Sequence, residues 1–378
     1  MNAVIDNLPL YLQGFGVTLS LFVIAGVSAI VLGTIVAAMR ISPVAGLRGA
    51  AAAYTEVLRN TPLTLVLLFF AFVLPQLAPR VPYFAAALVG LTLYTAPFVA
   101  EALPSGVNGV PIGQAEAARS LGMGFGQALT LIILPQAFRM VIPPLVNVLV
   151  ALAKNTSVAD GFFGAELFTV GKALANADGN SIIAILPGVA LAAALALAIG
   201  VAFATLRTSV FAWMRVPATV VLEFFRGMPV LLLMLFILLA SSFGAFWAVV
   251  LGLALYDGAI IGEILRAGLA SLPRGQREAG LSLGLTRLQT KTMIEFPQAF
   301  RQMLPVIVAR LVVLLKDTSL GHIVGYNELI RTTMNSMSSF YGNRSLLSLF
   351  IVTLVIYLAI DLSLSALARR LARKRISR

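Results

Sequence analysis

Apolar residues gather along the chain in long runs that are separated by short polar or basic segments. About 20 apolar residues in a helix cross the roughly 30 Å hydrocarbon core of a bilayer. A helix also satisfies its own backbone hydrogen bonds there. The pattern therefore predicts an all-α polytopic membrane protein with about nine spanning helices. The runs cover residues 14–39, 61–79, 83–104, 131–153, 181–206, 228–242, 244–265, 293–315 and 345–367.

Proline residues modify this picture at three of the runs. Pro62, Pro229 and the pair Pro143 and Pro144 are predicted to kink their helices, because proline lacks a backbone donor. The run 228–242 is short, and its helix is predicted to extend back through Val216–Phe225.

Composition and charge support a membrane protein. The chain is 60% hydrophobic and 11% charged, whereas a soluble domain is about a quarter charged. A net charge of +12 would suit nucleic acid, but 20 of the 27 basic residues fall on one side if the N-terminus is outside and the C-terminus inside. This is the positive-inside bias, and no nucleic-acid partner is needed. These residues are Arg40, Arg48, Arg59, Arg119, Arg139, Arg207, Arg215, Arg226, Arg266, Arg274, Arg277, Arg287, Lys291, Arg301, Arg369, Arg370, Arg373, Lys374, Arg375 and Arg378.

Several function classes are disfavoured by what the chain lacks. It has no cysteine and one histidine, His322, which excludes disulfides and thiolate or His-rich metal sites. No Gly-x-x-x-x-Gly-Lys-[Ser/Thr] string occurs, so the chain has no phosphate-binding loop of its own. The first 16 residues lack a basic start and a cleavage site, so the first apolar run is predicted to be retained.

The chain repeats itself in the same direction, which is the most informative feature of the sequence. Glu101 matches Glu263 at an offset of 162, whereas Arg40 matches Arg207 at an offset of 167. At the offset of 162 the longer matches are GQAEA (113–117) with GQREA (275–279), PQAFR (135–139) with PQAFR (297–301), and KNTS (154–157) with KDTS (316–319).

The repeats predict two units, residues 1–180 and 181–378, each built on a plan of five helices. Residues 181–206 align with the first helix of unit 1, yet they also occupy the place of the last helix of unit 2. One helix is therefore predicted to close the first unit and open the second, which gives nine crossings rather than ten.

A polar loop after the third helix of each unit has a recurring pattern, in loops 113–135 and 275–297. Glu-Ala-small is followed four residues later by a glycine and about a dozen residues later by Leu-Pro or Phe-Pro. This predicts a short helix that Gly122 or Gly284 ends in a left-handed cap. Thr286 and Gln289 are predicted to form a capping box that starts the next helix. The alternative is an ordinary surface loop. The same spacing in both loops argues against it.

These residues resemble the EAA signature of ABC importer permeases. The strings EAARSLGMGFGQALTLIILPQAFR and LLKDTSLGHIVGYNELIR look like the polar amino-acid branch, glutamate and glutamine permeases most of all. The resemblance implies a type I ABC importer permease fold in the bacterial cytoplasmic membrane. The implied partners are a cytoplasmic ABC ATPase dimer, which binds the ATP and Mg²⁺, and an extracytoplasmic substrate-binding protein. This chain itself would bind no cofactor and catalyse no reaction.

The resemblance also implies that the loop helices dock on the ATPase and couple its motion to transport. Gly280 departs from the usual third alanine, and nine helices depart from the usual ten. The coupling residues implied are Glu116, Ala117, Ala118, Gly122, Glu278, Ala279, Gly280 and Gly284.

Polar residues in the predicted helices are candidates for a substrate pathway, because such residues are costly in a bilayer. Asp257 stands where unit 1 has Thr95, and a hydrogen bond to a neighbouring helix would explain it equally well. For the others, interfacial snorkelling and helix ending remain alternatives. The remaining candidates are Lys154, Asn155, Thr156, Ser157, Lys316, Asp317, Thr318 and Ser319.

Charged pairs occur before the second helix of each unit. Glu56 with Arg59, and Glu223 with Arg226, are predicted to neutralise each other at i,i+3 spacing.

Two functions remain open at this point. The first is a permease subunit that imports a glutamate- or glutamine-like amino acid with energy from a separate ATPase. The second is an ion-coupled secondary amino-acid transporter, a class that often uses inverted repeats and intramembrane carboxylates. The parallel repeat favours the first.

Overall fold

The computed structural model describes residues 8–77, 81–163, 185–209, 211–326 and 346–376, and every regular element among them is a helix. Contacts divide the chain into two compact units, Met1–Ala165 and Glu166–Arg378. The boundary predicted between residues 180 and 181 lies outside the described residues.

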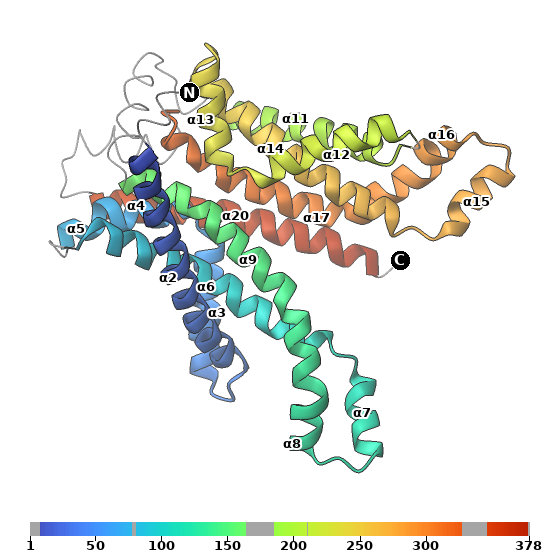
Figure 1. The fold of residues 1–378 in the computed structure, drawn as a ribbon, viewed down its shortest axis with the longest axis horizontal. Helices are drawn as coiled ribbons and strands as arrows, with labels where there is room; N and C mark the ends of the chain where they lie inside the picture. Colours follow the sequence, from blue (N-terminus) through green and yellow to red (C-terminus); the bar gives the residue numbers. More distant parts are fainter. Residues whose placement is uncertain (1–7, 78–80, 164–184, 210, 327–345, 377–378) are drawn as a thin grey trace. The chain divides into compact units, whose positions relative to one another are not determined.

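Unit 1 begins with a long helix and ends with another (Figure 1). Its elements are α2 (Leu8–Ile41), α3 (Ala45–Asn60), α4 (Leu63–Leu68), the π-helical turn η1 (Phe69–Val73), α5 (Leu74–Leu77), α6 (Tyr83–Gly109), α7 (Ile112–Ser120), α8 (Phe125–Gln127), the π-helical turn η2 (Ala128–Ile133) and α9 (Leu134–Phe163).

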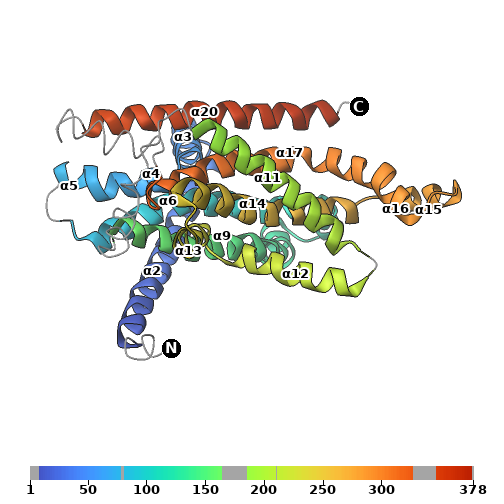
Figure 2. The same ribbon diagram turned by 90° about the horizontal axis from the view of Figure 1, so that it is seen from above.

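Unit 2 repeats this order and ends with a further helix that lies beside α17 (Figure 2). Its elements are α11 (Ile185–Arg207), α12 (Ala212–Gly227), α13 (Val230–Ala240), α14 (Gly244–Ala270), α15 (Arg274–Ser282), α16 (Arg287–Gln289), the π-helical turn η4 (Thr290–Glu295), α17 (Phe296–Asp317), the 3₁₀ turn η5 (Thr318–His322) and α20 (Leu346–Ile376).

Each of the nine predicted apolar runs falls on these helices. Six helices, α2, α6, α9, α11, α14 and α20, are long and apolar enough to cross a membrane, and two bent pairs raise the number to eight. The remaining run, 293–315, falls mainly on α17, which carries four charged residues. The chain is thus an all-helical polytopic protein with six to eight candidate spans in the part that the structure describes.

Proline breaks one helix in each unit. The axis turns by 101° between α3 and α4 and by 103° between α12 and α13. The residues before the prolines, Thr61 and Met228, have extended backbone, as the proline ring requires of its predecessor. The predicted continuation of the helix 228–242 back through Val216–Phe225 is therefore wrong, because Pro229 separates two helices. Pro143 and Pro144, by contrast, lie inside the unbroken helix α9.

Glycine permits a close contact between the first and third long helices of each unit. A Cβ on Gly33 of α2 would lie 2.6 Å from the Cβ of Val99 on α6, and one on Gly200 of α11 would lie 2.6 Å from Ile261 on α14. Small residues allow helices to approach in this way where lipid offers no hydrophobic driving force. Both glycines occupy the same repeat position, so the two units pack their first and third helices alike.

Candidate functional site

The loop helices α7 and α15 end in the same way. Gly122 and Gly284 follow them with φ of +77° and +79°, the left-handed conformation that the sequence predicts. The amide of Met123 donates to Ala118 and that of Leu285 to Gly280, at 3.1 and 3.2 Å. These six-to-one bonds are those of a Schellman cap, and the predicted helix ends are confirmed.

The return arm of the second loop also begins as predicted. Gln289 and Thr286 exchange the two bonds of a capping box, at 2.9 and 3.3 Å. In unit 1, Gln127 accepts from the amide of Gly124 at 3.1 Å, which is half of that box because glycine has no side chain. A π-helical turn then leads into α9 or α17. We call residues 112–133 hairpin 1 and residues 274–295 hairpin 2.

A side-chain bond joins the first arm of each hairpin to the long helix that follows, at the same place in both units. The amide of Gln136 donates to Gln114 at 3.3 Å, and that of Gln298 donates to Gln276 at 3.1 Å. The sequence places all four glutamines in the repeated strings but assigns them no role. The bond fixes the first arm of each hairpin against the root of the following long helix.

The outer face of each hairpin exposes the predicted coupling residues. Glu116 and Ala117 are exposed on α7, as are Glu278 and Ala279 on α15. The next residue is buried in both, as Ala118 or Gly280.

A leucine at the tip adds an apolar group to this face. Leu121 is 82% exposed and Leu283 is 78% exposed, at equivalent positions. Within each hairpin, the exposed leucine beside glutamate and alanine forms a small apolar surface with a charged rim. Such a surface is typical of a docking site for a partner protein.

Gly280 is explained by its neighbour on the other arm. A Cβ at residue 280 would lie 2.6 Å from Cγ2 of Thr290, which is buried. In unit 1 the same two positions hold Ala118 and Ala128, both buried. A smaller residue on the helix is therefore matched by a larger residue on the return arm.

This exchange predicts that Gly280→Ala loosens hairpin 2 by about 1–3 kcal/mol, the usual cost of overpacking. Adding Thr290→Ala copies unit 1 and is expected to recover most of that loss. Amide hydrogen exchange of α15 in the full chain measures the opening. Equal protection in the wild type and the single variant would contradict the explanation.

Hairpin 2 contains an ion pair that hairpin 1 lacks. Nε of Arg277 donates to Glu295 at 2.7 Å, and a second guanidinium nitrogen reaches the other carboxylate oxygen at 3.4 Å. The hydrogen bond to Glu295 raises the pKa of Arg277, and burial lowers the pKa of nearby Lys291. Arg277 therefore stays charged throughout the physiological range.

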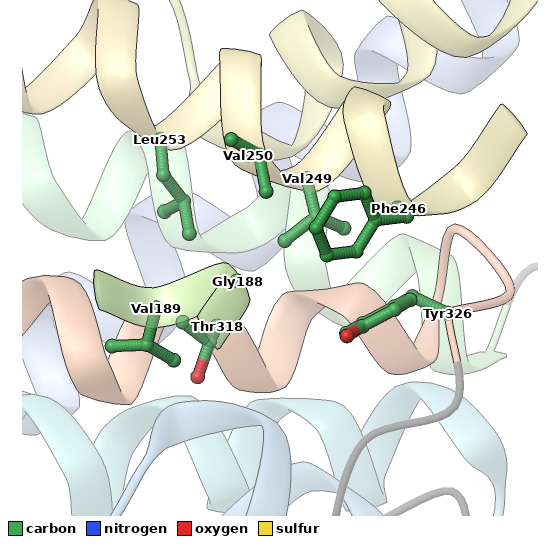
Figure 3. Close-up of a pocket in the computed structure, with 8 residues that line it drawn as sticks. All are labelled: Gly188, Val189, Phe246, Val249, Val250, Leu253, Thr318 and Tyr326. Carbon is green, nitrogen blue, oxygen red and sulfur yellow. The ribbon is translucent and has the colours of Figure 1, made fainter. Parts of the chain in front are cut away.

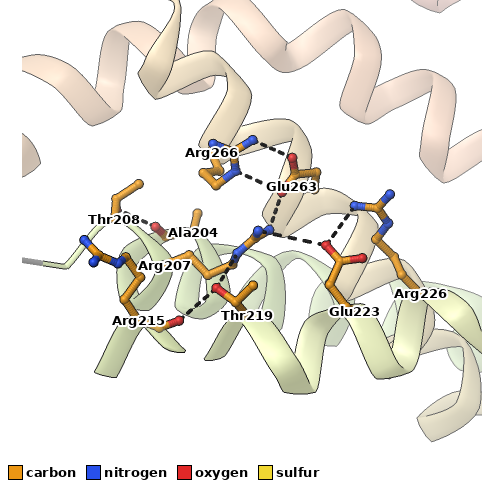
Figure 4. Close-up of polar contacts among 9 residues, drawn as sticks. All are labelled: Ala204, Arg207, Thr208, Arg215, Thr219, Glu223, Arg226, Glu263 and Arg266. Carbon is orange, nitrogen blue, oxygen red and sulfur yellow. Dashed lines mark hydrogen bonds and ion pairs between the residues drawn. The ribbon is translucent and has the colours of Figure 1, made fainter. Parts of the chain in front are cut away.

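Arginine–glutamate networks tie α6 and α14, the helices that lead into the hairpins, to neighbouring helices of the same unit. In unit 1, Glu101 of α6 accepts from Arg59 at 2.5 Å and lies 3.7 Å from Arg40. In unit 2, Glu263 of α14 pairs with Arg207 of α11 and with Arg266 at 2.6 Å (Figure 4).

The i,i+3 pair predicted in unit 2 joins the network of that unit. Arg226 lies 3.4 Å from Glu223, which confirms the pair in unit 2. In unit 1, the Glu56 carboxylate accepts from Asn60 at 3.1 Å, and Arg59 reaches Glu101 on another helix.

A second group of charges is buried within unit 2. Nε of Arg310 on α17 donates to Asp257 on α14 at 2.5 Å. A second guanidinium nitrogen lies 3.6 Å from Asp317, and the guanidinium lies 5.4 Å from the ring centre of Tyr256. Asp257 is fully buried. We call Asp257, Arg310 and Asp317 the charged triad.

Unit 1 has no charge at the equivalent positions, which hold Thr95, Val148 and Asn155. The hydrogen bond across helices that the sequence left open for Asp257 is thus present, and its partner, Arg310, is a residue that the sequence analysis did not single out. An alignment of the two repeats would have pointed to Arg310, because it aligns with the apolar Val148 of unit 1.

The other pathway candidates lie at the ends of α9 and α17. Thr156 and Ser157 bond to carbonyls of their own helix, and Thr318 and Ser319 do the same in unit 2. Lys154, Asn155 and Lys316 are half-buried. Polar stretches follow these candidates at residues 158–180 and 320–343, and most of each stretch lies outside the described residues.

Thr318 borders a small, mainly apolar pocket of unit 2 (Figure 3). The side chains of α14 line one side, and Thr318 and Tyr326 lie opposite them. The lining residues are Gly188, Val189, Phe246, Val249, Val250, Leu253, Thr318 and Tyr326.

Asp361 is a further acidic residue, to which the sequence analysis assigns no role. It lies within the candidate span of α20 and is fully buried. In the described ranges, no three His, Asp or Glu residues come close enough to hold a metal ion.

Comparison with known proteins gives the same family twice within the chain. The family described as the inner membrane component of binding-protein-dependent transport systems matches residues 29–216 and again residues 196–377.

Individual relatives align with about half of the chain. The glutamate transport system permease protein GluD of Corynebacterium glutamicum is 42% identical over 188 residues, which are 48% of this chain and 68% of that protein. The probable glutamine ABC transporter permease protein GlnM of Bacillus subtilis is 44% identical over 167 residues, 44% of this chain and 77% of that protein. A solved structure, the crystal structure of an amino acid ABC transporter with histidines, is 28% identical and covers 55% of this chain and 94% of its own, with a TM-score of 0.46.

Proposed function

Because the chain belongs to the family of binding-protein-dependent transport system inner membrane components, with two family domains in one polypeptide, we propose that it imports glutamate, glutamine or a similar polar amino acid. It is the permease of an ABC importer, and such permeases have no catalytic activity of their own. They work with an ATPase, which hydrolyses the ATP, and with a binding protein.

The observation that carries the coupling role is the pair of matched hairpins. Both end in a left-handed glycine, both are fixed by a glutamine–glutamine bond, and both expose a leucine at the tip. In our proposal the outer faces of α7 and α15 dock on a cytoplasmic ABC ATPase dimer. The proposed coupling residues on these faces are Glu116, Ala117, Gly122, Glu278, Ala279 and Gly284, with the added leucines Leu121 and Leu283. The remaining coupling residues, Ala118 and Gly280, lie buried behind the faces and support them.

The proposed topology has nine crossings, with the N-terminus outside and the C-terminus inside. It counts α17 as a span in addition to the eight candidates. The two family matches overlap at residues 196–216, which supports a role for the helix 181–206 in both units. In this topology the hairpins and the arginine–glutamate networks face the cytoplasm, and the binding protein docks on the opposite side.

The proposed substrate path runs past the polar ends of α9 and α17. An amino acid carries a carboxylate and an ammonium group, and the charged triad offers a partner of each sign, Arg310 for the carboxylate and Asp257 or Asp317 for the ammonium group. Unit 1 contributes neutral groups at the equivalent places, so substrate recognition would rest on unit 2. The further path residues are Lys154, Asn155, Thr156, Ser157, Lys316, Thr318 and Ser319.

In the proposed mechanism, the loaded binding protein docks outside and ATP closes the ATPase dimer. The hairpins then move the helices that they join, α6 with α9 and α14 with α17. The path opens alternately to the two sides of the membrane.

Uptake by vesicles that contain the permease, its ATPase and its binding protein tests the function. Among labelled amino acids, glutamate or glutamine is expected to accumulate. Accumulation is expected only when ATP is present on the side of the membrane where the ATPase is bound. Uptake that persists without ATP or without the ATPase would instead support an ion-coupled secondary transporter. Accumulation of other amino acids alone would overturn the substrate class but leave the importer mechanism standing.

A further inference from the structure

The two hairpins are held by different forces. In hairpin 2 two guanidinium nitrogens of Arg277 donate hydrogen bonds to the carboxylate of Glu295, at 2.7 and 3.4 Å. The Glu295 side chain is only 10% exposed, whereas that of Arg277 is 66% exposed. A two-pronged bond to a shielded carboxylate is stronger and more directional than an ordinary surface pair.

The ion pair spans the two arms of hairpin 2. Arg277 lies on α15 directly before the exposed Glu278, and Glu295 is the last residue of η4, directly before α17. A force applied to the face of α15 would therefore reach the root of α17 through this pair. The bond between Gln276 on α15 and Gln298 on α17 lies next to the ion pair in the sequence and also joins α15 to the start of α17.

Hairpin 1 has no counterpart to this pair. Its equivalent positions hold Ala115 and Ile133, which are both half-buried. These two positions carry no charge, and the small residues Ala118 and Ala128 of the two arms are buried. Apolar contacts are insensitive to screening by salt, whereas an ion pair with one exposed partner is weakened by it.

We propose that Arg277 and Glu295 are a positioning pair that sets the angle of α15 and transmits the motion of the partner ATPase to α17, in unit 2 alone. The transmission part rests on the proposed function. The two hairpins are then unequal in their response to salt and to loss of charge, although they have the same shape.

Distance measurements on the permease alone test the angle without any partner. The chain has no cysteine, so spin labels can be placed at Ser282→Cys and Thr292→Cys in hairpin 2. The equivalent pair in hairpin 1, Ser120→Cys and Thr130→Cys, is the matched control. We expect Glu295→Gln to broaden the distance distribution of hairpin 2 and to leave that of hairpin 1 unchanged. We expect the same contrast between low salt and about 1 M salt, where the Debye length is about 3 Å.

A variant that copies hairpin 1 distinguishes a specific ion pair from a general weakening. Arg277→Ala combined with Glu295→Ile is expected to keep a narrow distribution in hairpin 2 but to remove its dependence on salt. If instead the wild type shows no salt dependence, or Glu295→Gln leaves the distances narrow, the ion pair does not position α15 and the proposal is wrong.

Transport by the complete complex tests the transmission. Glu295→Gln is expected to lower the amount of amino acid imported per ATP roughly three- to tenfold, since losing such a pair is worth about 1 kcal/mol, while ATP is still hydrolysed. Arg277→Lys keeps the charge but loses the second bond, and an intermediate ratio is expected. An unchanged ratio in Glu295→Gln would refute the transmission. Failure of the wild-type complex to import with ATP would count against the proposed function instead, because the distance measurements need no ATPase.

Discussion

A chain that carries both Leu121→Asp and Leu283→Asp is expected to insert and fold normally but to lose ATP-driven uptake. Both leucines are about four-fifths exposed and lie at the tips of the hairpins, so their replacement removes no internal packing. An apolar residue at the centre of an interface contributes about 2 kcal/mol. Losing two therefore weakens docking on the ATPase by about a thousandfold. Copurification of the ATPase and uptake into vesicles measure the two effects.

Matched positions on the other arm provide the control. Thr130→Asp with Thr292→Asp adds the same two charges to exposed residues of the hairpins, and binding is expected to remain within a few-fold of the wild type. The single leucine variants are expected to fall between the wild type and the double variant. Normal uptake by the double leucine variant would mean that the ATPase does not dock on the tips.

Asp257→Thr is expected to destabilise unit 2 by about 3–5 kcal/mol. The substitution removes the 2.5 Å partner of an arginine whose side chain is only 15% exposed, and a buried charge that loses its partner costs about that much. The triple variant Asp257→Thr, Arg310→Val and Asp317→Asn copies unit 1 and leaves no unpaired charge of the triad. It is expected to regain most of the stability, as replacement of a buried ion pair by apolar residues often does.

Uptake separates the structural role of the triad from its role in transport. If the triad recognises the substrate, the triple variant is expected to be stable yet unable to import the amino acid, although the ATPase still binds. Thermal unfolding in detergent and uptake into vesicles are the two measurements. A triple variant that transports normally would show that the triad serves stability alone.

The repeated pattern of the sequence predicts most of the architecture because the same physics acts twice. The loop helices, their left-handed glycine ends and the capping box of Thr286 and Gln289 all follow from local rules that need no tertiary contact. The long apolar runs predict helices for a similar reason, since a bilayer admits few other structures.

Contacts between distant residues could not be predicted in the same way. Arg310 meets Asp257 across 53 positions of sequence, and Arg277 meets Glu295 across 18. The prediction of one continuous helix through Pro229 is also wrong, because the apolar composition continues through a residue at which the backbone must turn. In each case, side-chain reach or backbone geometry decided the outcome, and hydrophobicity does not report on either.

Unit 2 has the charged triad where unit 1 has neutral residues, and this difference has a consequence for synthesis. If the units were separate polypeptides, random pairing would yield a mixture of like and unlike halves. Since one messenger encodes both, every molecule leaves the ribosome with a single copy of each. Evolution can then let the halves drift apart in chemistry without any device for sorting partners.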